Sequence, residues 1–212
     1  VDFLLDNIIK YMPPKIMRND EVPQFRVTRS FDINKKYIPI NNFKGGVLGG
    51  SLVKGKLKVG DTIEIRPGLI NKLPNGKFKC MPLKTKILSL QTDTEKLDNI
   101  IPGGLIGIGT NIDPFYCEND NLSGSVIGLE NQLPSIYDII NINFTLLLFD
   151  KESEWEPKVN NDINIQIATL SINSKIIECK NNILKIQLSK PACIDDSMMI
   201  IVSTKVNKTI YI

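Results

Sequence analysis

The stretch from Phe43 to Gly68 constrains the fold more than any other part of the chain. It contains two glycine pairs, Gly45-Gly46 and Gly49-Gly50, and then two further glycine-containing turns before residue 62. Glycine pairs of this kind supply positive φ or let another backbone approach closely. Polar and apolar residues alternate from Thr62 to Arg66, which places Ile63 and Ile65 on a buried face and Glu64 on a solvent face. Turns every few residues between short apolar runs predict a small closed β-barrel.

The rest of the chain divides into a short helix and a series of β runs. Apolar residues at helical spacing predict a helix that ends at Pro13-Pro14. From Val22 onward the runs are short, and Phe25–Phe31 alternates with Phe25, Val27 and Phe31 on one side. Residues 34–42 and 71–79 are predicted loops, and residues 83–92 a strand. We expect an all-β chain with a helix and linker over residues 1–21, a first antiparallel barrel over 22–131 and a second over 132–212.

Composition excludes several classes of function. The chain has no histidine, which excludes His-based triads, His zinc sites and a His pH switch. The 26 basic and 23 acidic residues give a formal charge of +3, too little to indicate DNA or membrane binding by bulk electrostatics. No apolar run reaches the ~20 residues that span a bilayer. Four cysteines lie far apart; two disulfides stay possible, but reduced thiols in a cytoplasmic protein are favoured.

No motif in the sequence predicts a catalytic residue or a metal site. Residues 50–56 fit GxxxxGK, but Leu57 stands where a phosphate-binding loop needs Ser or Thr, and a hairpin turn is favoured. Asp61 with Glu64, and Asp195 with Asp196, are carboxylate pairs that we interpret as solvated charge. A third set of acidic residues comprises Asp113, Glu118 and Asp120. The spacing of these residues matches no known cation-binding loop.

Lysines interleaved with aromatic residues are spread over the loops of the first predicted barrel. Such a surface can bind RNA, but exposed lysines are also the ordinary state of a Lys-rich chain, and both interpretations stay open. The lysines are Lys35, Lys36, Lys44, Lys54, Lys56, Lys58 and those between 72 and 79, and the aromatic residues are Phe31, Tyr37, Phe43 and Phe78.

Several longer motifs together resemble one family. They are RSFDIN at residues 29–34, FKGGVLGGS at 43–51, LKVGD at 57–61, IEIRPG at 63–68 and PGGLIGIGT at 102–110. In combination they resemble the gamma subunit of eukaryotic and archaeal translation initiation factor two. The resemblance is strongest from Val22 to Pro134. It implies that the chain covers both β-barrels and the last helix of a GTP-binding domain, with the rest of that domain outside it.

The resemblance implies a binding role and not an enzymatic one for this chain. The family carries methionylated initiator tRNA to the small ribosomal subunit, and its GTPase domain binds GTP and magnesium. We therefore expect no cofactor in this chain, a cytoplasmic location, and contact with neither membrane nor DNA. The first barrel is expected to hold the 3′ end of the tRNA, with a glycine wall close to the terminal adenosine. The residues so assigned are Arg29, Lys44, Gly45, Gly46, Val47, Gly103, Gly104 and Leu105.

The resemblance also implies protein partners. The alpha subunit of the factor is expected to dock on two loops of the first barrel, and the beta subunit to bind the GTPase domain outside this chain. The alpha-docking residues are Asn34, Lys35, Lys36, Tyr37, Leu69, Asn75 and Lys77.

The second predicted barrel departs from the family pattern. Leu147-Leu148 and Thr204-Lys205 stand where the family tends to have arginines, and residues 171–174 replace a glycine-rich turn. Contact of this barrel with the tRNA stem is therefore open. Two rival interpretations also stay open: domains of the elongation factor that delivers selenocysteine, and a scaffold that binds only proteins.

Overall fold

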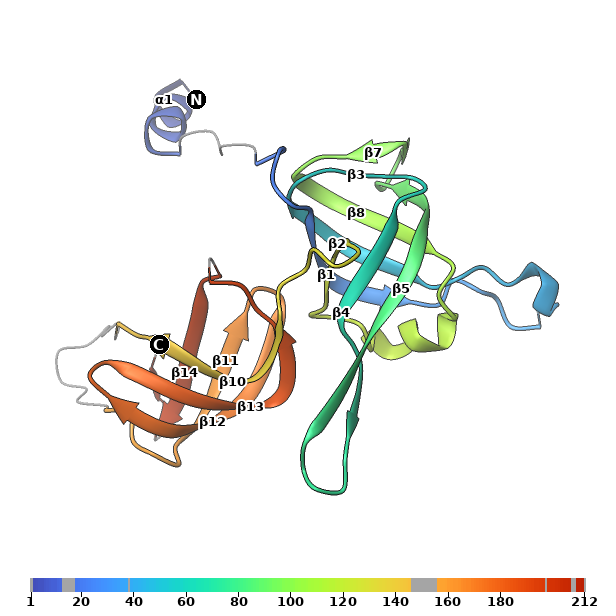
Figure 1. The fold of residues 1–212 in the computed structure, drawn as a ribbon. Helices are drawn as coiled ribbons and strands as arrows, with labels where there is room; N and C mark the ends of the chain where they lie inside the picture. Colours follow the sequence, from blue (N-terminus) through green and yellow to red (C-terminus); the bar gives the residue numbers. More distant parts are fainter. Residues whose placement is uncertain are drawn as a thin grey trace.

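The computed structural model describes residues 2–12, 18–37, 39–145, 156–196, 198–206 and 209–211. Most of these residues lie in antiparallel strands arranged as two sheets (Figure 1). The helical elements are α1 (Asp2–Tyr11) and two 3-10 segments, η1 (Ile40–Asn42) and η2 (Pro114–Asp120). The predicted all-β class with a short helix at its start is confirmed. No residue of α1 is buried, and no helix in the described ranges is long and apolar enough to cross a membrane.

The first sheet closes into a barrel of six strands. Its order is β4-β9-β1-β2-β8-β5, and β4 also pairs with β5, so that the sheet has no free edge there. The strands are β1 (Gln24–Phe31), β2 (Val47–Lys54), β4 (Thr62–Lys72), β5 (Phe78–Gln91), β8 (Gly103–Thr110) and β9 (Val126–Leu129). The short β6 (Lys96–Leu97) adds to β5, while β3 (Leu57–Lys58) pairs with β7 (Asn99–Ile100).

Alternating apolar side chains fill this barrel, as the period of two in the sequence predicts. The most buried members are Phe25, Val27, Leu48, Leu52, Ile63, Ile65, Ile87, Leu90, Ile108 and Ile127. The expected position of Phe31 on the same side is wrong. A β-bulge between Val27 and Arg29 inserts one residue, so that Ser30 points inward at 2% exposure and Phe31 outward at 39%.

The second sheet has six strands in the order β10-β13-β12-β11-β14-β15. The strands are β10 (Ile136–Asn143), β11 (Asp162–Ile167), β12 (Leu170–Lys180), β13 (Ile183–Cys193), β14 (Ile200–Val206) and β15 (Thr209–Tyr211). Isoleucines and leucines of β10 to β13 form its core. In the described part of the chain no ladder joins β10 to β14.

The predicted loop at residues 71–79 is replaced by a long hairpin. β4 and β5 stay paired from Leu69↔Met81 to Lys72↔Phe78, and only residues 73–77 form the turn, with Gly76 at φ 79°. Beyond Gly68, the hairpin extends out of the barrel as a two-stranded ribbon (Figure 1). The hydrophobic pattern missed it because most of its residues lie in solvent, where backbone hydrogen bonds hold the strands without an alternating apolar face.

Candidate functional site

Arg29 lies on the outer face of the first barrel and is held at one side by a carboxylate. Its Nε donates to Asp120 Oδ1 at 2.9 Å, and the Ser30 amide donates to the same oxygen at 2.9 Å. These two hydrogen bonds and the Arg29 charge hold the pKa of Asp120 below its ordinary value. The Arg29 side chain is still 66% exposed, so its remaining N–H groups face solvent and can bind a phosphate.

Arg29 pairs with Gly49 of β2, and Lys44, Gly45, Gly46 and Val47 lie farther toward the start of that strand. Phe31 pairs with Val47 across the β1–β2 ladder. The two glycines are needed for packing within the chain itself. A Cβ on Gly45 would stand 2.0 Å from the carbonyl oxygen of Thr110, and one on Gly46 would stand 2.2 Å from Cys117 Sγ. Their missing side chains therefore make room for β8 and η2.

Gly103, Gly104 and Leu105 lie at the other end of the β2–β8 ladder. Val47 pairs with Gly109 but Leu52 with Gly103, which separates the two glycine groups by five residues of β2, about 17 Å. Gly103 and Gly104 have φ of +118° and +66°; nothing lies within 4 Å of a Cβ placed on Gly103, and a Cβ on Gly104 would make only an ordinary contact with Ile106 Cδ1 at 3.8 Å. Leu105 is 74% exposed. The structure therefore does not bring the two predicted groups together into one wall.

Asn34 joins the predicted alpha-docking loop to the predicted tRNA surface. Its Oδ1 accepts from the Lys44 amide at 2.8 Å, and its Nδ2 donates to the Lys44 carbonyl at 2.7 Å. Asp32 Oδ1 accepts from the Asn34 amide and side chain. These contacts close the base of the loop. The loop residues that follow Asn34 are exposed, and they are Lys35, Lys36 and Tyr37. The side chain of Tyr37 is fully exposed.

The other predicted alpha-docking residues lie on a different side of the barrel. Asn75 and Lys77 are exposed in the tip of the β4–β5 hairpin, where Asn75 Oδ1 accepts from the Lys77 amide at 3.0 Å, and Leu69 is half-buried at its base. In Figure 1 the segment around η1 extends to the right and the hairpin tip to the bottom. The two loops therefore do not form one continuous surface.

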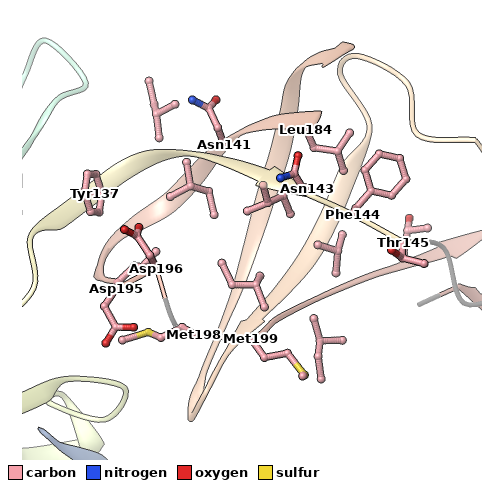
Figure 2. Close-up of a pocket in the computed structure, with 18 residues that line it drawn as sticks. Tyr137, Asn141, Asn143, Phe144, Thr145, Leu184, Asp195, Asp196, Met198 and Met199 are labelled. Carbon is pink, nitrogen blue, oxygen red and sulfur yellow. The ribbon is translucent and has the colours of Figure 1, made fainter. Parts of the chain in front are cut away.

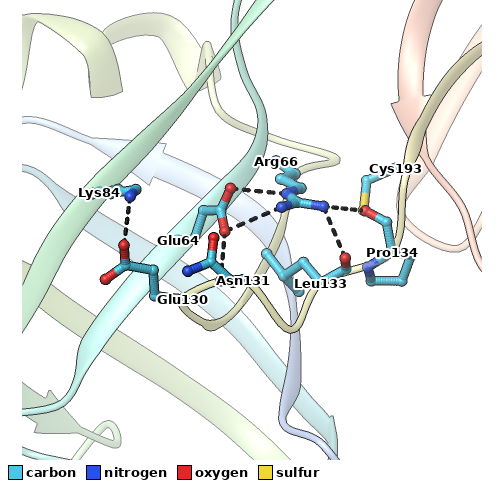
Figure 3. Close-up of polar contacts among 8 residues, drawn as sticks. All are labelled: Glu64, Arg66, Lys84, Glu130, Asn131, Leu133, Pro134 and Cys193. Carbon is cyan, nitrogen blue, oxygen red and sulfur yellow. Dashed lines mark hydrogen bonds and ion pairs between the residues drawn. The ribbon is translucent and has the colours of Figure 1, made fainter.

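Glu64 contradicts the expectation that it points into solvent. It is 3% exposed, because the segment connecting the two sheets covers it. Arg66 Nε donates to Glu64 Oε1 at 2.9 Å, and the Asn131 amide donates to Oε2 at 3.1 Å. Arg66 Nη1 donates in turn to the carbonyls of Leu133 and Pro134 (Figure 3). We call Glu64, Arg66 and residues 131–134 the clasp.

A buried thiol and an exposed ion pair flank the clasp. Cys193 donates its S–H to the Pro134 carbonyl at 3.3 Å, and burial raises the pKa of this thiol to about 12, so that it stays protonated. On the other side Lys84 pairs with Glu130 (Figure 3). The sequence contains one signal that could have indicated the clasp: residues 64 and 66 carry opposite charges and lie on the same face of one strand.

Strand β1 also contacts the second sheet through polar groups. Gln24 Nε2 donates to Asp195 Oδ2 at 2.9 Å, and Thr169 Oγ1 donates to the Val27 carbonyl at 3.0 Å. Arg26 Nη1 lies 3.1 Å from Met198 Sδ; burial lowers the pKa of this guanidinium, although the charge of Asp195 opposes the shift. These contacts join β1 to the second-sheet half of the chain, and the clasp and Cys193 bind the connecting segment from β4 and β13.

Comparison with known proteins identifies the family. A family described as "Initiation factor eIF2 gamma, C terminal" matches residues 140–211. The chain is 35% identical to the eukaryotic translation initiation factor 2 subunit gamma of Schizosaccharomyces pombe over 217 residues, 98% of this chain and 49% of the relative. It is 37% identical to the eukaryotic translation initiation factor 2 subunit 3 of Drosophila melanogaster over 216 residues, 97% of this chain and 46% of the relative.

The chain belongs to the family of translation initiation factor two gamma subunits. It spans about half the length of the curated relatives that it matches. The family match to residues 140–211 covers most of the second sheet, which is the part whose sequence departs furthest from the expected pattern. Of those departures, Leu147 and Leu148 lie outside the described residues, residues 171–174 belong to β12, and Thr204 belongs to β14.

In this gamma-family chain the GxxxxGK stretch is the end of strand β2 followed by a turn. β2 ends at Lys54, Gly55 has φ +77°, and β3 begins at Leu57, so no helix follows to bind a phosphate. Asp61 also lies in a turn, where its Oδ2 accepts from the Lys58 amide at 2.9 Å. Within the described ranges no group of three or more Cys, Asp or Glu side chains could hold a metal ion.

A groove of about 740 Å³ separates β10 from β14 in the second sheet. Its walls are mainly apolar, and Figure 2 shows Asp195 and Asp196 at one end and Phe144 and Thr145 at the other. Sequence reasoning did not predict this groove, because it results from two strands that do not pair. The carboxylate pair at residues 195 and 196 therefore lies at an open groove, although Asp195 Oδ2 accepts a hydrogen bond from Gln24.

Proposed function

We propose that this chain is the part of an initiation factor two gamma subunit that contacts methionyl initiator tRNA and docks the alpha subunit. The observation that carries the proposal is the identity of 35% and 37% to two such subunits, spread over 97% or more of the chain. The whole protein would then deliver the tRNA to the small ribosomal subunit and bind the GTP and magnesium of the switch. This chain would bind and not catalyse.

Alpha-subunit docking is best placed on the segment that Asn34 closes. The hydrogen bonds from Asn34 to the Lys44 backbone pre-organise the exposed residues 35–37, which lowers the cost of ordering them on binding. The hairpin residues Leu69, Asn75 and Lys77 stay a prediction, because they lie away from this segment.

Asn34→Ala is expected to weaken alpha-subunit binding about tenfold, because the loop loses the side chain that holds its base. The measurement is a calorimetric titration of the chain with the C-terminal domain of the alpha subunit. The matched control is Asn75→Ala in the hairpin tip, which removes another asparagine whose side chain accepts a hydrogen bond from a nearby backbone amide, that of Lys77. A larger loss from the Asn75 variant would place the docking surface on the hairpin. No binding by the folded wild-type chain would remove the alpha-subunit proposal.

The tRNA end is proposed to contact the outer face of the barrel at two places. Arg29 and Lys44 would bind phosphates at the start of β2, and the open backbone of Gly103-Gly104 beside exposed Leu105 would approach the terminal nucleotide. The separation of about 17 Å means that each place binds a different part of the tRNA.

Gly104→Asp is expected to weaken initiator tRNA binding by the full-length parent protein at least tenfold. The new carboxylate would stand in open space at the surface, repelling the tRNA phosphates while the barrel stays folded. Filter binding with methionyl initiator tRNA measures the loss, and thermal unfolding checks the fold. Gly60→Asp, an exposed glycine with φ +94° in the turn before β4, is the matched control. Unchanged tRNA affinity in a folded Gly104→Asp protein would contradict the assignment.

A further inference from the structure

The end of η2 is fixed firmly against the first barrel. Cys117 and Leu122 are 0% and 1% exposed and belong to the core of that barrel. Ser30 of β1 holds the backbone at both of these residues, because its hydroxyl donates to the Cys117 carbonyl and accepts from the Leu122 amide, each at 3.1 Å. Residues 117–122, which we call the support segment, are therefore anchored at both ends.

The β-bulge in β1 makes this anchoring possible. In a regular strand, Arg29 would share the inner face with Val27, and Ser30 would point outward. The inserted residue reverses the two, so that Ser30 points inward to the support segment and Arg29 points outward beside it. The Ser123 hydroxyl adds a further contact, since it donates to the Thr28 carbonyl within the bulge at 2.8 Å.

Asp120 lies where the backbone of the support segment is most unusual. Asn119 and Asp120 have φ of 53° and 57°, in the left-handed region that residues other than glycine seldom adopt. Asn and Asp enter this region more readily than other side chains because they can hydrogen-bond locally. The turn directs the Asp120 carboxylate to β1, where Oδ1 accepts from Arg29 Nε and from the Ser30 amide, each at 2.9 Å. One oxygen atom therefore ties the Arg29 side chain to the backbone of its own strand.

The remaining part of the Arg29 guanidinium faces an accessible surface. Asp120 engages Nε, which leaves the terminal Nη groups as the fork that can bind a phosphate through two parallel hydrogen bonds. Gly49 lies opposite Arg29 in the β1–β2 ladder. A Cβ on Gly49 would make only ordinary contacts, at 3.7 Å with Phe31 and 3.8 Å with Arg29. The barrel does not need this glycine to avoid a clash, and its missing side chain keeps the surface beside Arg29 low.

The Asp120 carboxylate has two opposing effects on a phosphate that binds Arg29. Hydrogen bonds from Arg29 and Ser30 lower the pKa of Asp120, so it is ionised at neutral pH and repels the phosphate. The same carboxylate fixes a long side chain before binding, and immobilising such a side chain otherwise reduces affinity about two- to tenfold. Because the pair is exposed, solvent and salt screen the repulsion but leave the orientation unchanged. Orientation therefore outweighs repulsion at physiological ionic strength.

We propose that Asp120 is a positioning residue, which holds Arg29 with its Nη groups directed outward to bind a phosphate of the tRNA end. This role rests on the proposed function and deepens it, because it adds a residue that acts on the tRNA through another one. The acidic set with Asp113 and Glu118, in which the sequence places Asp120, gives no sign of it.

The test is a double-mutant cycle in the full-length parent protein, read by filter binding of methionyl initiator tRNA at about 150 mM KCl. Asp120→Gly removes the carboxylate without strain at positive φ and is expected to weaken binding about fivefold. In the Arg29→Ala background the same change is expected to have no further effect. Asp120→Asn keeps an Oδ1 acceptor and tolerates this φ, so it is expected to restore most of the affinity.

Asn119→Gly is the matched control for Asp120→Gly. It changes the neighbouring residue, which is exposed and has φ 53°, and it keeps the carboxylate. We expect nearly unchanged tRNA affinity from this variant. Thermal unfolding confirms that each variant is folded.

Each other outcome overturns the inference. An Asp120→Gly protein that binds tRNA more tightly than the wild type would show that the carboxylate only repels the ligand. Equal losses from Asp120→Gly with and without Arg29, or from Asn119→Gly, would assign the effect to folding of the support segment. An Asp120→Asn protein as weak as Asp120→Gly would exclude orientation by the hydrogen bond.

Failure of this inference is distinguishable from failure of the proposed function. Binding of tRNA by the wild type, together with an Arg29→Ala protein of unchanged affinity, would remove the role of Asp120 and leave tRNA binding in place. Absence of tRNA binding by the folded wild type would remove both.

Discussion

Replacing Glu64 with alanine is expected to reduce the free energy of unfolding by about 3–5 kcal/mol. Glu64 is 3% exposed and accepts hydrogen bonds from Arg66 and from the Asn131 amide. Without the carboxylate, the Arg66 guanidinium keeps only the carbonyls of Leu133 and Pro134 and loses its counter-charge. Removing one partner of a buried pair costs far more than the pair itself contributes, because the remaining charge is desolvated and unpaired.

Urea denaturation of the wild type and the Glu64→Ala variant measures this loss. Glu130→Ala is the matched control, since Glu130 also pairs with a basic side chain but lies in solvent, where such a pair contributes little. Equal effects of the two variants would show that the clasp contributes no more than an ordinary surface ion pair.

The pH dependence of the contribution of Glu64 to stability has a defined sign. Burial alone would raise the pKa of Glu64, but the hydrogen bonds from Arg66 and Asn131 and the charges of Arg66 and Lys84 bring it below the ordinary value of 4.5. The carboxylate therefore stabilises the fold fully above pH 4.5, and this contribution is lost as the pH falls through the lower folded pKa. We expect the stability difference between wild type and Glu64→Gln to be constant near neutral pH and to shrink below about pH 4. A difference that grows on acidification would contradict this sign.

The same residue shows what could be predicted from the sequence and what could not. Alternation in β4 predicts that Ile63 and Ile65 are buried, because that pattern is local. The burial of Glu64 depends on Asn131 to Pro134, which lie far along the chain and fold back over the outer face of the strand. No pattern of period two contains that information.

The errors at Phe31 and in the hairpin have different causes. At Phe31 one inserted residue reversed the faces of β1, and a bulge leaves no mark in an alternating sequence that is read as regular. In the hairpin the strands are exposed and polar, so the hydrophobic signal is absent although the backbone ladder continues to Lys72↔Phe78.

The sequence motifs nominate the candidate residues, but the arrangement of these residues in space could not be predicted from them. The motifs assign Asn34 to alpha-subunit docking and Lys44 to tRNA binding, and the structure joins the two residues directly. The two glycine groups have similar sequences, yet the register of β2 against β8 puts them at opposite ends of a ladder. Strand register is a property of the fold, and it decides which glycines face open space.

Gly45→Ala is expected to destabilise the chain by about 3 kcal/mol, the largest effect that we predict for a single added methyl group among the residues of the proposed tRNA surface. The added Cβ would stand 2.0 Å from the Thr110 carbonyl oxygen and 2.8 Å from Asn111 Cα. Both atoms belong to backbone, and this backbone is fixed because the Thr110 amide and hydroxyl both donate to the Gly46 carbonyl, at 3.2 and 2.7 Å. The β2–β8 ladder must therefore separate to admit the methyl group.

Gly104→Ala is the matched control for Gly45→Ala. Its Cβ meets only Ile106 Cδ1, at 3.8 Å, so the cost is limited to the strain of φ +66° in a non-glycine residue, about 1 kcal/mol. Urea denaturation separates the two variants, and equal losses would show that the contact at Gly45 relaxes freely. Because Gly45 is required by the barrel, reduced tRNA binding in a Gly45 variant would reflect unfolding as well as contact. The barrel does not require a glycine at position 104 to avoid a clash. A loss of tRNA binding in a Gly104 variant can therefore be attributed to the surface itself.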